Sequence, residues 1–296
     1  MNRFAVCVGS VIVTLFAATF ANAALRYDWD EVLLPQAAVF PKLSRESEQR
    51  YFDQMFREQG IEPDSNKAQI VRAWINKIRQ DPIIAAAVPG GAKGIGRLFL
   101  DTQTRESLLL NGLVRLSAAD RLSYVQLLSK FLDELVPVDC FGLLNMNDVM
   151  SRISLREMSD SDVAQYFNLL SKVLVSDAVD APIVLPTREQ YTAAKQQFAD
   201  ALFVQLSGDQ SDITRFQHYS AHPAQATPSD ACWVTRVTMH AILSMPDPGR
   251  DYILLISILQ SGEQAKTQAG DPAPSEARPA APSPASAQPP GGAPGR

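Results

Sequence analysis

The feature that most constrains the fold is a stretch that the chain contains twice. Residues 116–132 read LSAADRLSYVQLLSKFL, and residues 158–174, at a constant offset of 42, read MSDSDVAQYFNLLSKVL. The copies share a serine, an aspartate, a tyrosine, three leucines and a Ser-Lys pair. The identical positions are Ser117/Ser159, Asp120/Asp162, Tyr124/Tyr166, Leu127/Leu169, Leu128/Leu170, Ser129/Ser171, Lys130/Lys172 and Leu132/Leu174.

Each copy has the pattern of an amphipathic helix with its own start signal. The Ser-x-x-Asp opening is typical of a helix N-terminus, where the serine side chain accepts hydrogen bonds from backbone N–H groups that lack partners. Apolar residues then recur at the 3.6-residue spacing of a helix. The first copy carries Tyr124, Leu127, Leu128, Phe131 and Leu135 on this face, and the second carries Tyr166, Leu169, Leu170 and Val173. We therefore predict two helices of one type.

Most other segments also favour helices joined by short connections, and no Asn-Gly-type hairpin turn separates alternating runs. The predicted fold class is all-α, an irregular helical bundle or a short stack of helical hairpins. The 42-residue offset falls in the range of helical-repeat arrays, but such arrays need about three units to bury their faces. Chance agreement between two amphipathic helices explains the likeness equally well.

Individual elements carry narrower expectations. Thr187 with Gln190 predicts a capping box that opens a helix to about residue 206, preceded by an extended connector at 182–186. Ser229 or Asp230 is expected to cap the helix that follows. Residues 207–228 are polar and rich in turn formers, which favours an exposed loop. The apolar run 252–259 fits either a helix or a buried strand.

Both ends are expected to lie outside the fold. Residues 1–23 combine Arg3, an apolar run and the small-x-small site Ala21-Asn22-Ala23, which predicts a cleaved signal peptide. A retained N-terminal anchor is the alternative. Residues 262–296 hold eight of the 20 prolines among Ala, Gly, Ser and Gln, a composition typical of disorder. A single helical domain is therefore predicted for residues 24–261, in a periplasmic or secreted protein.

The charge pattern excludes several partners. The net charge is −5 and the 27 basic residues are scattered, so neither a nucleic acid nor an anionic membrane surface is expected to bind. No transmembrane segment is expected after signal removal. The glycine-rich stretch 89–97 lacks the spacing of a P-loop or a dinucleotide fingerprint. No cofactor is therefore predicted.

Two cysteines remain once Cys7 leaves with the signal peptide. In an oxidising compartment, Cys140 and Cys232 have one intramolecular pairing, which would close a loop of 92 residues. We predict this disulfide. Two buried free thiols are the alternative.

Candidate catalytic residues are few. The three histidines are His218, His222 and His240, and His218 and His222 have the i, i+4 spacing of a metal-binding pair. Pro223 and the missing Glu of an H-E-x-x-H motif count against a metalloprotease site. His240 has the surroundings of a core or boundary residue. Asp212 and Asp230 are the nearby carboxylates that could assist an imidazole. No Gly-x-Ser-x-Gly elbow is present.

These observations favour an exported, non-enzymatic helical binding protein of a bacterial-type cell envelope, with a protein or peptide partner. The alternative is an envelope hydrolase or metal-dependent enzyme centred on His218, His222 and His240. A structural spacer whose C-terminal tail reaches through the envelope is a third possibility. The sequence does not indicate an oligomeric state.

Overall fold

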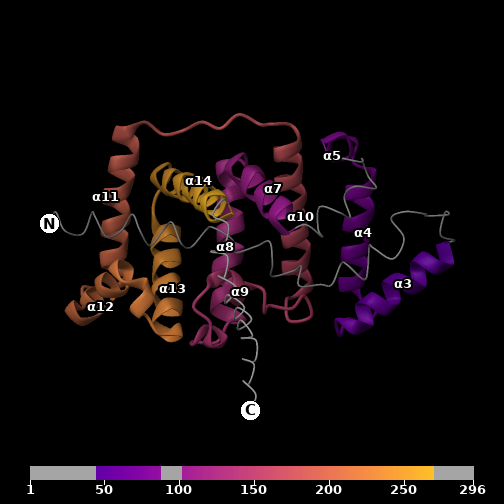
Figure 1. Ribbon diagram of the computed structural model, residues 1–296, viewed down its shortest axis with the longest axis horizontal. Coiled ribbons are helices and arrows are strands. Elements are labelled where there is room, and N and C mark those ends of the chain that lie inside the picture. The colour runs from indigo at the N-terminus through magenta and orange to yellow at the C-terminus, as the bar shows by residue number, and fades with distance from the viewer. Residues whose placement is uncertain (1–44, 88–101, 270–296) are drawn as a thin grey trace, which may run out of the picture.

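The computed structural model describes residues 45–87 and 102–269, and all regular structure within these ranges is helical (Figure 1). The all-α prediction is confirmed. The predicted signal peptide, the glycine-rich stretch 89–97 and the tail beyond residue 269 lie outside the described residues.

The α-helices are, in chain order, α3 (Arg45–Glu58), α4 (Asn66–Gln80), α5 (Pro82–Ala87), α7 (Thr102–Val114), α8 (Ala118–Glu134), α9 (Met146–Met150), α10 (Asp160–Ala178), α11 (Arg188–Gln205), α12 (Gln210–Ala221), α13 (Pro228–Ser244) and α14 (Gly249–Ala269). Two short 3-10 helices, η2 (Cys140–Gly142) and η3 (Pro223–Gln225), lie between them.

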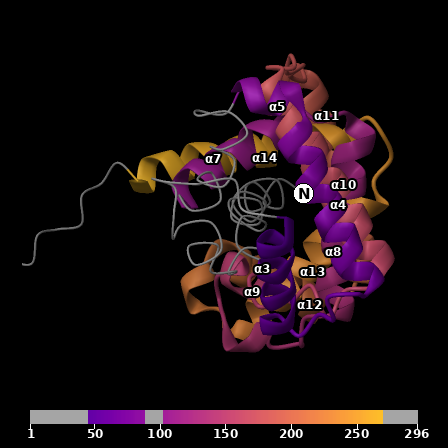
Figure 2. The same ribbon diagram turned by 90° about the vertical axis from the view of Figure 1, so that its right-hand side faces the viewer.

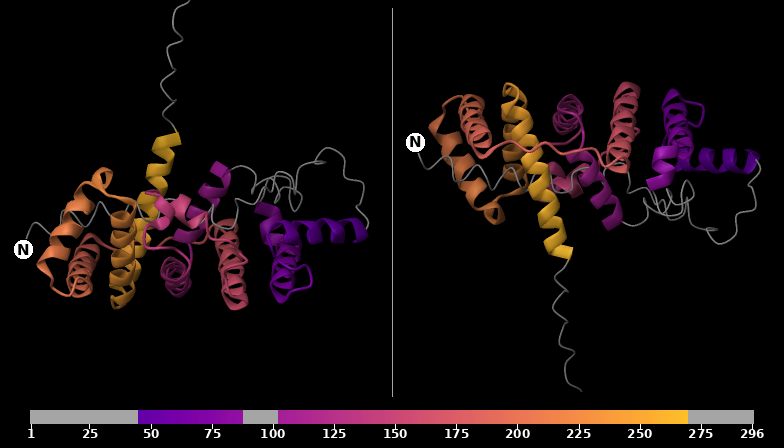
Figure 3. Two further views of the ribbon diagram at one scale, coloured as in Figure 1. Left: turned by 90° about the horizontal axis from the view of Figure 1, so that it is seen from below. Right: turned by 90° about the horizontal axis from the view of Figure 1, so that it is seen from above.

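Five long helices stand side by side in a row. Neighbours in the row are α4, α10, α8, α13 and α11, and each packs against the next (Figure 1). Figure 3 shows several of these helices nearly end-on. Helices α7 and α14 cross one face of the row, which Figure 2 shows from the side. The twin helices α8 and α10 therefore occupy the middle of the molecule.

The predicted caps of the central helices are confirmed. Ser117 and Ser159 each accept a hydrogen bond from the backbone N–H three residues later, that of Asp120 and Asp162. Thr187 and Gln190 form the predicted capping box of α11. These signals are local, because the capping side chain and its partner lie within four residues of each other.

The stretch 207–228 departs from the prediction of an exposed loop. Residues 210–221 form helix α12, whose N-terminus is capped by Asp209 through the backbone N–H groups of Ser211 and Asp212. Ile213 and Phe216 are buried on one face of this helix. The prediction of a loop is wrong because a short apolar stripe among many polar residues is enough to stabilise a helix when a neighbouring helix covers it.

The start of α13 also differs from the prediction. The N-cap is Thr227, with Pro228 at the first helical position, and not Ser229 or Asp230. Asp230 is the third helical residue and closes the capping box by accepting from the Thr227 backbone N–H. Proline suits the first turn, where a missing N–H costs nothing, and this moves the helix start toward the N-terminus.

At the C-terminal side, the ambiguous run 252–259 is helical and belongs to α14. The helix continues to Ala269, past residue 262, where the tail was expected to begin. Residues 262–269 contain Glu, Gln, Ala and Lys, which are good helix formers, and the first proline of the tail is Pro272. The helix therefore extends further than composition suggested.

The extended connector predicted between α10 and α11 is confirmed, and it runs along the top of the molecule in Figure 1. Its Val184 and Leu185 side chains are 82% and 59% exposed. Elsewhere the core is continuous from α3 to α14. Within the described ranges, no helix combines the length and hydropathy needed to cross a lipid bilayer.

Candidate functional site

The twin helices are joined by two equivalent ion pairs. Lys130 near the end of α8 binds Asp162 at the start of α10, with Nζ 2.7 Å from Oδ1. Lys172 near the end of α10 binds Asp120 at the start of α8 in the same way. Because each C-terminal lysine meets the other helix's N-terminal aspartate, the helices run antiparallel and are related by an approximate two-fold axis.

The surroundings of both ion pairs stabilise the ionised form of the aspartates. Burial raises the pKa of Asp120 and Asp162, but hydrogen bonds from the partner lysine and the capping serine outweigh it, so each pKa lies below its ordinary value. Between the two pairs, burial and the nearby Tyr166 raise the pKa of Tyr124 well above its ordinary value. Equivalent tyrosines therefore lie near the two-fold axis. The two ion pairs together fix the direction of α8 relative to α10 and the position of the C-terminal end of α8.

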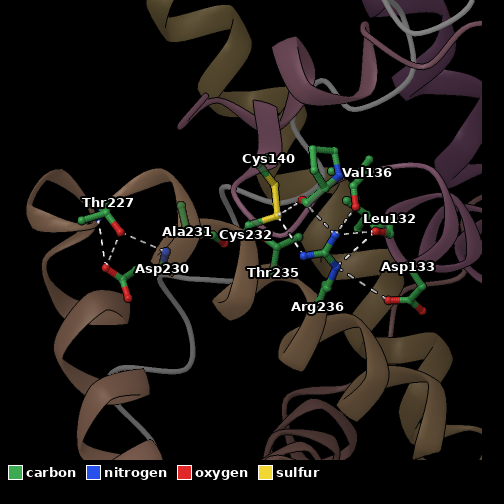
Figure 4. Close-up of a disulfide and its surroundings, with 11 residues drawn as sticks. Leu132, Asp133, Val136, Cys140, Thr227, Asp230, Ala231, Cys232, Thr235 and Arg236 are labelled. Carbon is green, nitrogen blue, oxygen red and sulfur yellow. Dashed lines mark hydrogen bonds and ion pairs between the residues drawn. A yellow bond between two sulfur atoms is a disulfide. The ribbon is translucent and has the colours of Figure 1, made fainter. Parts of the chain in front are cut away.

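A loop follows that end of α8 and is tied to α13. We call residues 135–145 the disulfide loop. Its Cys140 is bonded to Cys232 of α13, with an S–S distance of 2.04 Å and both cysteines fully buried (Figure 4). The structure thus contains the predicted pairing. Cys140, Phe141 and Gly142 have φ values of 50°, 57° and 74°, so the chain turns sharply through three left-handed residues.

Arg236 of α13 holds the base of the same loop. Its guanidinium donates to the carbonyl oxygens of Leu132 and Val136 at 2.6 and 2.7 Å and to that of Pro137 at 3.2 Å. Figure 4 shows the guanidinium between these carbonyls and the disulfide, where a guanidinium nitrogen lies 3.1 Å from the Cys232 sulfur. Carbonyls at a helix end have no partner within the helix. Arg236 therefore caps α8 from a neighbouring helix.

The loop presents apolar side chains to solvent despite this rigid anchoring. Val138 is 81% exposed, Phe141 40% and Leu144 54%. Residues around them form turn hydrogen bonds, including Cys140 N–H to the Pro137 carbonyl at 3.0 Å and Gly142 N–H to the Asp139 carbonyl at 2.9 Å. The side chains are therefore displayed on a backbone that the disulfide, Arg236 and local hydrogen bonds hold in place.

The histidines predicted as candidates do not form one centre. His240 of α13 contacts Asp133 of α8, with Nε2 2.8 Å from Oδ2, and so joins the helices beside the disulfide loop. His218 lies in the last turn of α12 and His222 is the C-cap of the same helix, with ring centroids 5.2 Å apart. Across the described residues, no three His, Cys, Asp or Glu side chains are grouped so that they could hold a metal ion. The enzyme hypothesis therefore lacks the three-histidine convergence on which it depended.

The two candidate aspartates serve helix ends. Asp212 lies in the first turn of α12, where its backbone N–H donates to the Asp209 cap. Asp230 accepts from the Thr227 hydroxyl at 2.6 Å and from Arg215 at 2.6 and 3.0 Å. The Thr227 hydrogen bond, together with Arg215, lowers the pKa of Asp230 to about 2. A carboxylate so firmly ionised and fully engaged is poorly suited to proton transfer near neutral pH.

Sequence reasoning identified the cysteines of this region but not the rest of it. Arg236 stands alone in an apolar helix, and nothing local links it to carbonyls about 100 residues earlier. The apolar residues Val138, Phe141 and Leu144 resemble core positions in the sequence. One signal was present, namely Pro137, Asp139 and Gly142 around Cys140, a combination typical of a turn.

Comparisons with protein-family models, with curated proteins and with solved structures give no match for this chain.

Proposed function

We propose that this chain is an exported, non-enzymatic binding protein, and that the disulfide loop is its contact surface for a protein or peptide partner. The observation that carries the proposal is the combination of a fixed loop backbone with exposed Val138, Phe141 and Leu144. Solvent-exposed apolar side chains that gather on one loop are typical of an interaction site.

A rigid loop supports binding because less conformational freedom is lost when the partner arrives. The disulfide loop is fixed at its base by Arg236 and in its middle by Cys140. The conformational entropy of the loop is therefore lost during folding and not when the partner binds. Apolar side chains displayed in this way can enter a pocket of the partner and act as anchors.

The charges around the loop indicate the kind of partner. Glu134 and Asp139 are exposed on either side of Val138. A partner with an apolar pocket and a basic rim would complement both features, because complementary charges at a rim guide association and orientation. We therefore expect a protein or peptide of this character rather than a nucleic acid, whose phosphates Glu134 and Asp139 would repel.

The compartment is part of the same proposal. A disulfide between buried cysteines persists in an oxidising environment such as the periplasm or the extracellular space. The signal-like segment 1–23 points in the same direction. Together they support an exported protein of the bacterial-type envelope.

The test compares three forms of the full chain as bait in envelope extracts. The wild type, the double variant Val138→Asp/Leu144→Asp and the matched control Val184→Asp/Leu185→Asp are immobilised, and retained proteins are identified by mass spectrometry. The control changes two apolar side chains that are just as exposed, but on the connector after α10. All three should unfold at similar denaturant concentrations, because exposed substitutions change stability by about 0.5 kcal/mol or less.

We expect one protein to be retained by the wild type and the connector variant and lost by the loop variant. With that protein purified, the loop variant should bind at least about tenfold more weakly, because charges would replace apolar anchors in a desolvated pocket. Equal retention by all three forms would contradict the assignment of the loop. Loss by the connector variant alone would place the contact surface at the other end of the molecule.

A further inference from the structure

Helix α12 gives the histidine pair a geometry that an exposed loop would not have. His218 and His222 lie one turn apart at the C-terminal end of this helix, and both are solvent-exposed. Their ring centroids are 5.2 Å apart with an interplanar angle of 34°. From this placement we infer that His218 and His222 form a surface site for one divalent transition-metal ion. The inference is independent of the partner proposed for the disulfide loop.

The spacing of the rings fits a shared ion. Imidazole nitrogen binds zinc at about 2.0–2.1 Å, so two imidazoles at a tetrahedral angle around one ion have centroids roughly 5 Å apart. The separation in α12 already has this value.

A hydrogen bond selects the nitrogen that is free to bind. Nδ1 of His222 lies 3.1 Å from the backbone carbonyl oxygen of His218. When Nδ1 carries the proton and donates to this carbonyl, Nε2 keeps its lone pair and is the metal ligand. His218 is restrained in turn by an edge-on contact with Tyr219, at a centroid distance of 5.0 Å. Both rings are therefore partly ordered before an ion arrives.

The local charges also suit a cation. The carbonyl end of a helix is negative, and His222 is the C-terminal cap of α12. The basic residue of this helix, Arg215, is paired with Asp230 and lies over the Trp233 ring at 4.3 Å. Its charge is therefore neutralised by the start of α13. Repulsion of an incoming ion is correspondingly small.

The ligand set indicates the class of ion. Two neutral imidazoles with water in the other positions suit copper, nickel and zinc, whereas magnesium and calcium prefer oxygen ligands. With two protein ligands, the ion would keep open positions that a further ligand from another molecule could fill. The site belongs to the surface of α12, and nothing in the proposal requires a reaction at the metal.

The test is calorimetric titration of zinc chloride into the full chain. The wild type should bind one ion, and His218→Ala and His222→Ala should each weaken binding at least about tenfold, since either change removes half of the protein ligands. His240→Ala is the matched control, because His240 is bonded to Asp133 and not to this pair. It should leave zinc binding unchanged.

A second readout locates the ion. Substoichiometric copper(II) should broaden the imidazole NMR signals of His218 and His222 and spare those of His240. The inference is overturned if the wild type binds no zinc at millimolar concentration, or if either alanine variant binds as well as the wild type. Equal loss in His240→Ala would also overturn it, because the pair on α12 would then not be the site.

Discussion

Reduction of the Cys140–Cys232 bond is expected to lower the free energy of unfolding by about 4–5 kcal/mol. The bond joins residues 92 positions apart, so breaking it frees a long loop in the unfolded chain and makes that state more favourable. Urea denaturation of the oxidised and reduced forms, followed by circular dichroism, measures the difference. The helical signal in the absence of urea should remain, because the buried apolar residues of the twin helices pack against each other without the covalent bond.

A double serine variant separates the covalent bond from the reductant. Cys140→Ser/Cys232→Ser should reproduce the loss of stability without any reducing agent. An Arg236→Met variant serves as a partial control, because it keeps the disulfide and removes the guanidinium contacts to Leu132 and Val136. The Arg236→Met variant should lower the free energy of unfolding by about 2 kcal/mol. Equal stabilities of the oxidised and reduced chains would show that the two cysteines are not joined in the folded protein.

Gly112→Ala is the substitution with the second largest expected effect. A Cβ atom at this position in α7 would clash with the Val173 carbonyl oxygen of α10, which is backbone and cannot rotate away. Helices α7 and α10 would have to separate, and we expect a loss of about 2–3 kcal/mol. The sign of this change in stability is informative, because alanine in place of glycine within a helix otherwise stabilises the protein by about 1 kcal/mol.

Gly249→Ala is the matched control for this prediction. A Cβ there would meet the Oε1 atom of Gln197, the far end of a flexible and exposed side chain. The glutamine can rotate, so the stability should change by less than about 1 kcal/mol. Thermal unfolding of both variants beside the wild type makes the comparison. If Gly112→Ala were as stable as Gly249→Ala, α7 and α10 would not be in the close contact described above.

Local sequence signals predicted the secondary structure of the central helices well. Ser117 and Ser159 each precede an aspartate by three residues, and capping depends only on such neighbours. The start of α13 is harder to predict, because Thr227, Ser229 and Asp230 are all acceptable N-caps. Pro228 was the feature that favoured Thr227.

Helix α12 is not predicted by the sequence for a different reason. Its composition is polar, and only Ile213 and Phe216 offer clear apolar positions. The stability of such a helix comes from the surface it packs against, here α13, and a sequence window does not contain that surface. The same limit applies to the disulfide loop. Val138 and Leu144 are as apolar as core residues, and only the tertiary fold determines that they are exposed.

The antiparallel pairing of α8 and α10 was likewise beyond the sequence. The repeat predicts two similar helices but leaves their relative direction open. The structure resolves it through long-range contacts, since Lys130 meets Asp162 and Lys172 meets Asp120. This pairing positions the end of α8, from which the disulfide loop begins. The proposed contact surface therefore depends on it.

Zero-length carbodiimide crosslinking tests this pairing most directly. The reagent joins a carboxylate and an amine that are already in contact, through an amide bond formed with loss of water. Peptide mass spectrometry of the treated protein should find Lys130 linked to Asp162 and Lys172 linked to Asp120. Asp162→Asn should remove the first link and keep the second. The absence of both expected links would contradict an antiparallel pair of twin helices at the centre of this protein.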